Sequence, residues 1–268
     1  AIHLAQEVAL TNARAALDEA SIPYVVIKGA HLGRVLYDDP LQRVGVDVDV
    51  LVSPEDKARA IATLTDRGFQ AKARAQTATH EINFTDGRAW IDLHWHLLRP
   101  GRTRRPVEDD ILTTRQTIGG VSVPDDTWTT VIMLVHNAIT DTVTARANRA
   151  VDLARWVSRR TLDWDEIAKR IAAMGLIAAA WATLTWVDDL LGLNLKQTTV
   201  STLRPPLLQR AYLRAWLRAD PSALYRDHPH LVRFGFGLAL HDTPKDALRF
   251  ALRFIATAPE RRLAPTKR

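Results

Sequence analysis

The sequence predicts an α+β fold in two parts: a mixed β-sheet with flanking helices over residues 1–123, and an all-helical part over residues 124–268. Three observations support this prediction. Short β-branched or alternating segments bounded by turn residues are confined to the first part. Apolar residues at helical spacing dominate from Pro124 onward. Residues 99–124, rich in Arg, Gly and Pro, separate the two patterns and form the expected junction.

The first part begins with a helical pattern and continues with strands and helices. Ser21-Ile22-Pro23 ends the first helix, because a residue before proline disfavours helical geometry. Ser53 and Pro54 are typical of an N-cap and a first helical position. Asp86-Gly87 is a two-residue turn signal. The expected elements are helices over 1–20, 30–37 and 53–68, strands over 24–27, 45–52 and 69–76, and a hairpin over 80–98.

The second part shows helical patterns. The segment from Thr161 to Glu166 supplies a capped helix start, and Gly175 and Gly192 supply stops. His228 and His230 lie in a Pro-containing stretch that is expected to be a loop. The expected helices span 126–143, 146–160, 163–174, 176–191, 205–219 and 244–257.

Bulk composition limits the class of protein. The 268 residues, 47% hydrophobic and 25% charged, are ordinary for a globular chain. No apolar run approaches the roughly 20 residues that span a bilayer. The absence of cysteine excludes disulfides and thiolate metal ligands. No signal-peptide pattern begins the sequence, so a cytoplasmic location without membrane association is expected.

The chain carries a formal net charge of +6. This charge fits an anionic substrate, a nucleic acid, or simply an Arg-rich composition. Basic residues are spread along the chain, with local clusters at Arg99–Arg105 and Arg261–Arg268.

Two acidic residues stand out in the Val-rich strand. Because strand side chains alternate between faces, Asp47 and Asp49 share one face, and the other carries Val46, Val48, Val50 and Val52. A buried valine face would hold the two carboxylates side by side, as a divalent cation site requires. The alternative is a pair of solvated surface acids.

A third carboxylate follows in the hairpin, where Asp92 shares a face with Trp90, His94 and His96. Three carboxylates on two strands suit a pair of Mg²⁺ ions about 3.5–4 Å apart, which need hard oxygen ligands. Zinc would explain the His94-x-His96 pair only with further ligands. We expect His94 beside Asp92 and a structural role for His96.

The order of these motifs resembles the uncharacterised nucleotidyltransferase family of the polymerase-beta-like superfamily. That family has a Lys-Gly after the first strand, a Tyr-x-Asp/Pro-x-x-Arg stretch, a DxD strand and a later Asp-Leu-His-Trp. The matching segments here are Lys28-Gly29, Tyr37 to Arg43, Asp47 to Val52, and Asp92 to Trp95. The resemblance implies that Asp47, Asp49 and Asp92 are the catalytic metal ligands, with Asp92 also the general base.

The phosphate-binding turn departs from the wider superfamily, whose usual Gly-Ser is here Lys28-Gly29. We expect backbone N–H groups at Gly29 and the following helix N-terminus to bind phosphate, and Lys28 to add positive charge. A lysine extending along the strand end is the alternative. Arg43 would either bind phosphate or pair with Asp38 or Asp39, and His94 would complete the nucleotide site.

The resemblance continues into the helical part through His136, Arg149, Asp152 and Asp163-Trp164. A structural ion pair between helices is the favoured reading of His136, Arg149 and Asp152. The alternative is that they line the cleft that residues 124–268 are expected to close.

The sequence therefore predicts a Mg²⁺-dependent enzyme with two bound ions that transfers a nucleoside monophosphate, expected to be AMP from ATP, to an acceptor hydroxyl. A small molecule or natural product is the expected acceptor. The alternatives are a toxin-like enzyme acting on tRNA or protein, for which the basic clusters would matter, and a non-catalytic nucleotide-binding module.

Overall fold

A computed structural model describes residues 2–39, 42–43, 45, 47–72, 80–141, 147–193, 203–219, 224–226 and 228–257. The chain divides into two compact units. The first contains residues 1–99 and 106–129, and the second contains residues 100–105 and 130–268. Whether they are a catalytic domain over 1–123 and a cleft-closing domain over 124–268 stays a prediction.

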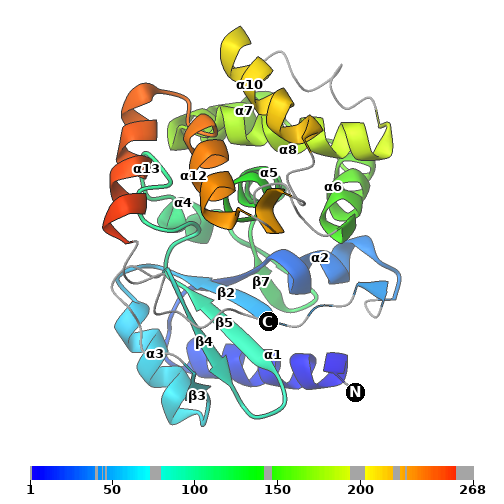
Figure 1. Ribbon diagram of the computed structural model, residues 1–268. Coiled ribbons are helices and arrows are strands. Elements are labelled where there is room, and N and C mark those ends of the chain that lie inside the picture. Colours follow the sequence, from blue (N-terminus) through cyan, green and yellow to red (C-terminus); the bar gives the residue numbers. More distant parts are fainter. Residues whose placement is uncertain are drawn as a thin grey trace. The chain divides into compact units, whose positions relative to one another are not determined.

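The first unit is built on a five-stranded mixed sheet (Figure 1). Its central strands β2 and β5 are parallel, and the other neighbouring strands are antiparallel. This arrangement confirms the predicted α+β class. In sheet order the strands are β1 (Tyr24–Ile27), β2 (Val48–Val52), β5 (Trp90–His94), β4 (Glu81–Thr85) and β3 (Gln70–Ala71).

One face of this sheet is apolar and packs on α1 (Ile2–Glu19) and α3 (Lys57–Asp66) (Figure 1). The alternation predicted for the Val-rich strand is confirmed for the described valines, whereas Val46 lies outside the described residues. The core shared by these elements includes Leu10, Leu17, Val48, Val50, Val52, Leu64, Phe84, Ile91 and Leu93. The opposite face carries Asp49 and Asp92. Two further helices, α2 (Lys28–Leu36) and α4 (Glu108–Thr113), contact β1 and β2.

Several predicted boundaries are wrong. The strand predicted from Gly45 begins at Val48, so Asp47 precedes it. The hairpin ladder ends at the pair Thr85–Trp90, which makes the connection four residues long instead of two. Asp86 stabilises this loop by accepting hydrogen bonds from the backbone N–H groups of Arg88 and Ala89, both at 2.9 Å.

The helix predicted to start at Ser53 starts at Lys57. Ser53 Oγ instead accepts a hydrogen bond from the backbone N–H of Glu55 at 3.3 Å, in the turn before the helix. The strand predicted over 69–76 is represented by β3, and residues 73–76 lie outside the described part of the chain.

The segment predicted as a junction is mostly structured. It contains α4 and a small hairpin of β6 (Gln116–Ile118) and β7 (Val121–Val123), and β7 contacts β1. Gly119 and Gly120 form the turn at φ of 56° and 74°, a region that glycine enters without a steric penalty. The junction prediction missed this hairpin because its strands are only three residues long.

The regular secondary structure described in the second unit is helical, as predicted. Its helices include α6 (Ala147–Arg159), α7 (Trp164–Met174), α8 (Ile177–Leu191), α10 (Leu207–Arg218), α12 (Pro229–Ala239) and α13 (Pro244–Ala256), and α5 (Asp126–Asp141) begins in the first unit. The loop predicted around His230 is wrong, since Pro229 occupies the first turn of α12, where its missing N–H costs nothing.

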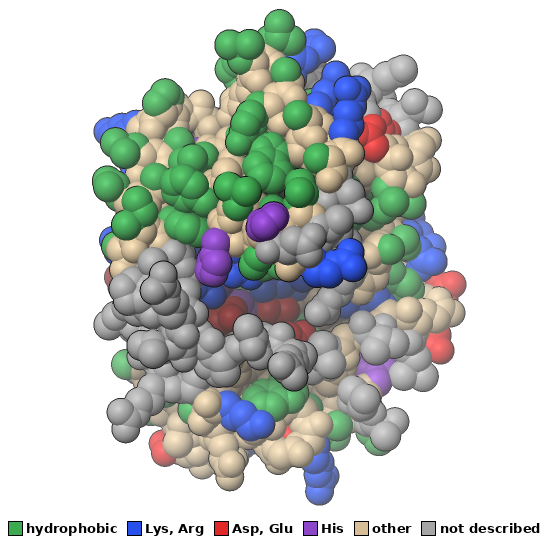
Figure 2. Space-filling view, viewed as in Figure 1, with side chains coloured by type: hydrophobic (Ala, Val, Ile, Leu, Met, Phe, Trp, Pro, Cys, Tyr) green, Lys and Arg blue, Asp and Glu red, His purple; other side chains and the backbone are tan. Residues whose placement is uncertain are grey.

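Apolar side chains gather on the surface of α10, α12 and α13 (Figure 2). The most exposed are Leu208 (84%), Leu207 (70%), Ile255 (63%) and Leu231 (62%). Among the described helices, none is both long and apolar enough to cross a membrane.

Candidate active site

Two carboxylates lie side by side at the centre of the sheet. Asp49 on β2 is in register with Asp92 on the parallel strand β5, and in-register neighbours share a face. Neighbouring strands are about 4.8 Å apart. The parallel pairing of two strands distant in sequence therefore brings the predicted DxD strand and the later Asp-Leu-His-Trp strand together.

Asp49 is nearly buried, at 8% exposure, and is held by two nitrogen atoms. Lys28 Nζ and His94 Nε2 each lie 2.8 Å from Asp49 Oδ1. Burial would raise the pKa of this carboxyl group, but the Lys28 ammonium and the hydrogen-bonded His94 outweigh burial and hold the pKa far below its usual value. Asp49 is therefore ionised at neutral pH.

Asp92 is 4% exposed and accepts a hydrogen bond from Asn83 Nδ2 on β4. Asn83 stands directly opposite Asp92 in the ladder. Sequence reasoning missed Asn83 because a two-residue turn at Asp86-Gly87 would have paired Asn83 with Trp90. An amide opposite Asp92 orients the carboxylate without adding a second negative charge.

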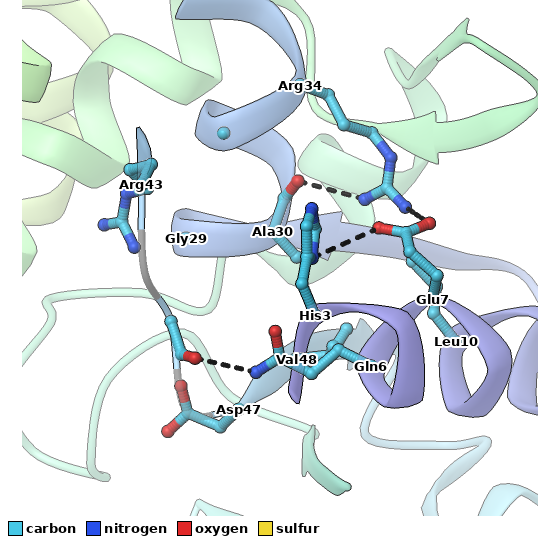
Figure 3. Close-up of a pocket in the computed structure, with 12 residues that line it drawn as sticks. His3, Gln6, Glu7, Leu10, Gly29, Ala30, Arg34, Arg43, Asp47 and Val48 are labelled. Atoms are coloured by element: carbon cyan, nitrogen blue, oxygen red, sulfur yellow. Dashed lines mark hydrogen bonds and ion pairs between the residues drawn. The ribbon is translucent and has the colours of Figure 1, made fainter. Parts of the chain in front are cut away.

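Asp47 lies outside the ladder and lines a pocket with Gly29 and Arg43 (Figure 3). The prediction that Asp47 and Asp49 both lie in a regular strand is therefore wrong for Asp47. A role for Asp47 as a metal ligand stays a prediction.

Lys28 and Gly29 are the first two residues of α2, which follows β1 directly. Lys28, and not the glycine, has the left-handed backbone, at φ of 55°. This conformation costs a side-chain-bearing residue roughly 1–2 kcal/mol. It accompanies the ion pair of the ammonium with Asp49, so the side chain is directed at a carboxylate and is not simply extended along the strand end.

Gly29 is needed for the close approach of Arg43. A Cβ atom on Gly29 would lie 2.7 Å from Arg43 Nη1 and 3.3 Å from Cζ. The guanidinium group thus lies over the backbone where the sequence predicts phosphate binding, and Figure 3 shows it beside Gly29.

The same pocket is bounded by the N-terminal helix, which sequence reasoning did not assign to the site. Gln6 Nε2 donates to the carbonyl of Gly45 at 2.9 Å, and Arg34 pairs with Glu7 while donating to the carbonyl of Ala30 at 3.0 Å (Figure 3). These bonds fix α1 to α2 and to the segment before β2. No residue pattern on α1 predicts that Gln6 and Glu7 bind the elements around the pocket.

His94 was expected beside Asp92, but its partner is Asp49. Its other ring nitrogen, Nδ1, lies 3.5 Å from Glu81 Oε2. His80, 5% exposed, lies next to this pair, and burial followed by nearby positive charges lowers its pKa to about 2. His96 lies beyond the strand, 3.5 Å from Glu108 Oε1. The His94-x-His96 pair therefore does not act as one ligand set.

Of the predicted residues in the helical part, His136 on α5 and Arg149 on α6 contact each other and link these two helices. Arg149 Nη1 lies 3.1 Å from His136 Nδ1 and donates to Asn137 Oδ1 at 3.4 Å. Asp152 is buried, at 1% exposure. A structural link between helices, the favoured reading, agrees with the Arg149 contacts.

Two arginines of the basic cluster at residues 99–105 make contacts inside the second unit. Arg104 Nη2 donates to Asp246 Oδ2 at 2.7 Å, and the Arg102 guanidinium lies 4.2 Å from the Phe250 ring centroid. The basic tail over 261–268 lies outside the described residues.

Comparisons with known proteins agree with the motifs. A family model described as uncharacterised nucleotidyltransferase matches residues 3–192. No curated protein matches the chain.

Three solved structures are similar in fold. The antibiotic-resistance factor ANT(2'')-Ia in solution is 14% identical, with a TM-score of 0.45 over 66% of this chain and 94% of that chain. Its crystal structure in complex with adenylyl-2''-tobramycin is 13% identical, with a TM-score of 0.44 over 62% and 94%. An antigenic nucleotidyltransferase-like protein from Paracoccidioides brasiliensis is 16% identical, with a TM-score of 0.39 over 90% and 93%.

The family match covers most of the chain, including the segments of Lys28, Asp49 and Asp92, so this protein belongs to the uncharacterised nucleotidyltransferase family and is a transferase.

Proposed function

We propose that this nucleotidyltransferase moves a nucleoside monophosphate, AMP from ATP, to the hydroxyl group of a small molecule with release of pyrophosphate. The observation that carries this proposal is the in-register pair Asp49–Asp92 on parallel strands. Two buried carboxylates on one face need compensating positive charge, which the Lys28 ammonium supplies in part and divalent cations would complete.

The residues present fit Mg²⁺. The donors are carboxylate oxygens, which are the hard ligands that Mg²⁺ prefers. Within the described part of the chain, Lys28 and His94 both contact Oδ1 of Asp49, and Oδ2 is left for a metal. Asp47, Asp49 and Asp92 would together hold two ions. When bound, Mg²⁺ neutralises the triphosphate and lowers the pKa of the acceptor hydroxyl group.

The side chains around these acids have distinct tasks in this proposal. Asp92, oriented by Asn83, accepts the proton of the acceptor hydroxyl group transiently. Lys28 compensates the charge of Asp49 in the free enzyme and contributes positive charge to the phosphates. Arg43 and the backbone at Gly29 bind the triphosphate, and His94 fixes the orientation of Asp49. Catalysis then consists mainly of positioning and charge neutralisation.

The test is Mg²⁺-dependent release of pyrophosphate from each nucleoside triphosphate in the presence of a panel of hydroxylated small molecules. We expect turnover with ATP, and a loss of at least 100-fold in Asp49→Asn and Asp92→Asn. Asp66→Asn is the matched control, because this exposed acid ends α3 on the opposite side of the sheet. If Asp92→Asn keeps wild-type turnover, the assignment of Asp92 is wrong.

A panel of tRNA and protein acceptors is tested in parallel. Label transfer from ATP to RNA or protein, with none to the small molecules, would overturn the proposed acceptor class. It would leave the roles of Asp49 and Asp92 intact.

A further inference from the structure

The β4–β5 hairpin carries a cluster of three ligand-type side chains, of which the proposed transfer reaction uses only His94, to orient Asp49. His80, Glu81 and His94 each offer one ligand atom, and these atoms lie within 4.8 Å of one another. His80 and His94 are 5% and 0% exposed, and the Glu81 side chain is 25% exposed. His80 directly precedes β4, and Glu81 faces His94 across the ladder.

The hydrogen bond to Asp49 determines which nitrogen of His94 carries the proton. An ionised carboxylate only accepts hydrogen bonds. His94 Nε2, 2.8 Å from Asp49 Oδ1, must therefore be the N–H donor. In the neutral ring Nδ1 then holds a lone pair. This atom is fully buried, and among the described residues it has no hydrogen-bond partner. Burying a polar atom without a hydrogen-bond partner lowers the stability of the fold, so a ligand bound to this lone pair would be stabilising.

Two distances indicate what that ligand is. Glu81 Oε2 lies 3.5 Å from His94 Nδ1 and 3.6 Å from His80 Nε2. Both exceed the usual N–H···O range of about 2.7–3.2 Å. They match instead the edges of a tetrahedron around zinc, since ligand atoms about 2.0–2.2 Å from the metal are roughly 3.3–3.6 Å apart.

We propose that His80 Nε2, Glu81 Oε2 and His94 Nδ1 bind one Zn²⁺ ion, with Asp49 as the carboxylate that orients His94. Two imidazoles and one carboxylate form a zinc-type ligand set, unlike the all-oxygen set for Mg²⁺. A water molecule would complete the tetrahedron. Metal-bound histidines commonly donate their other N–H to a carboxylate, and Asp49 occupies this position. The zinc site would thus hold rigid the imidazole that positions Asp49.

The test measures zinc binding without nucleotide, so its outcome does not depend on the proposed transfer activity. Metal-free full-length protein is titrated with Zn²⁺ against a chromophoric chelator, and with Co²⁺ to detect the visible absorption of a tetrahedral site. We expect one ion per chain, and at least 100-fold weaker binding in His80→Gln and Glu81→Gln.

His241→Gln is the matched control. His241 is also buried, at 4% exposure, and its Nε2 has no partner among the described residues, but it belongs to no such cluster. Its substitution should leave zinc affinity unchanged. Wild-type protein that binds no Zn²⁺ at micromolar concentration, or a folded His80→Gln that binds like wild type, overturns the proposal. If circular dichroism shows His80→Gln to be unfolded, the more exposed Glu81→Gln decides.

Substitutions of the acids separate this site from the Mg²⁺ ligands. Asp49→Asn should weaken zinc binding 10- to 100-fold, the usual effect of losing a carboxylate behind a metal-bound histidine. Asp92→Asn should leave zinc affinity unchanged. If Asp92→Asn loses zinc binding while His80→Gln retains it, the ion binds at Asp49 and Asp92 and the proposal is contradicted.

Discussion

Lys28 and Asp49 form the ion pair on which the site depends. Their side chains are only 18% and 11% exposed, and the ammonium lies 2.8 Å from Oδ1. Removing one partner of a buried ion pair leaves the other charge desolvated and unpaired. The resulting loss of stability is larger than the net stabilisation that the intact pair provides. The fold accommodates the left-handed backbone of Lys28 at the position where its side chain forms this ion pair.

Lys28→Met should lower the free energy of unfolding by about 3 kcal/mol at pH 7, because Asp49 loses its main cation. The folded-state pKa of Asp49 lies below the unfolded value of about 3.9. The stabilisation is therefore complete above about pH 4 and is lost as the pH falls through the folded-state pKa. Urea unfolding should show a smaller difference between the two proteins at pH 3. An equal loss when Lys28→Met is made in an Asp49→Asn background would contradict this account.

Gly29→Ala tests the contact with Arg43. The new methyl group would lie 2.7 Å from Arg43 Nη1, the end of a flexible side chain, so the guanidinium group should swing away with a stability change under about 1 kcal/mol. Nucleotide affinity, measured by titration, should fall as far as it does in Arg43→Ala. The double variant should be no weaker than Arg43→Ala. An additional loss in the double variant would mean that the methyl group disturbs phosphate binding at the Gly29 backbone itself.

Among the elements, strand pairing decides which polar groups meet. Asp49, Asp92 and Asn83 form one row because β2, β5 and β4 are in register at these positions. Shifting the β4–β5 register by two residues would keep every side chain on its face. It would place Glu81 opposite Asp92, and two like charges opposite each other destabilise a sheet.

Helix ends in the second unit provide a matched comparison. Gly175 and Gly192 end α7 and α8 at φ of 75° and 64°. A Cβ on Gly192 meets no described atom within 4 Å, whereas one on Gly175 lies 3.1 Å from Asp246 Oδ2 and 3.2 Å from Arg104 Nη2. Gly192→Ala should cost only the left-handed penalty of about 1–2 kcal/mol. Gly175→Ala should cost measurably more, because it also disturbs the ion pair. Equal losses in urea unfolding would show that the pair adapts freely.

For the whole molecule, buried histidines should make stability depend on pH. Burial, followed by the charge of Arg102, lowers the pKa of His241 to about 4, and Asp246 opposes this shift. The unfolded chain takes up a proton below about pH 6.5 while the folded chain does not. Stability is therefore complete above pH 6.5 and is lost as the pH falls from 6.5 towards 4, by about 3 kcal/mol in total.

His241→Leu should remove this contribution and keep the packing against Phe250, whose ring centroid is 5.2 Å from that of His241. Urea unfolding at pH 7 and pH 5 should show a smaller pH effect in the variant than in wild type. If the difference in stability between pH 7 and pH 5 is the same in the variant as in wild type, the pH dependence comes from other groups, such as His80.

Periodicity predicted most of the elements because it is a local property. The predicted strand Tyr24–Ile27 has the observed bounds. The capped helix start predicted within 161–166 is confirmed, and its cap is Asp163, whose Oδ1 accepts a hydrogen bond from the backbone N–H of Glu166 at 3.0 Å. Predictions failed where two signals competed. The helix-starting proline at residue 229 was read as a loop signal, and the short hairpin of β6 and β7 offered too few residues for a pattern.

The sequence by itself determined the α+β class, the valine face of the central strand, and the motifs by which the chain resembles the nucleotidyltransferase family. These follow from side-chain alternation and motif order, which are properties of neighbouring residues. Only the tertiary structure decided that Lys28 and His94 both hold Asp49, that Asn83 orients Asp92, and that His80 and Glu81 stand beside His94. These contacts depend on strand register and loop length, which are fixed by the packing of segments far apart in the chain.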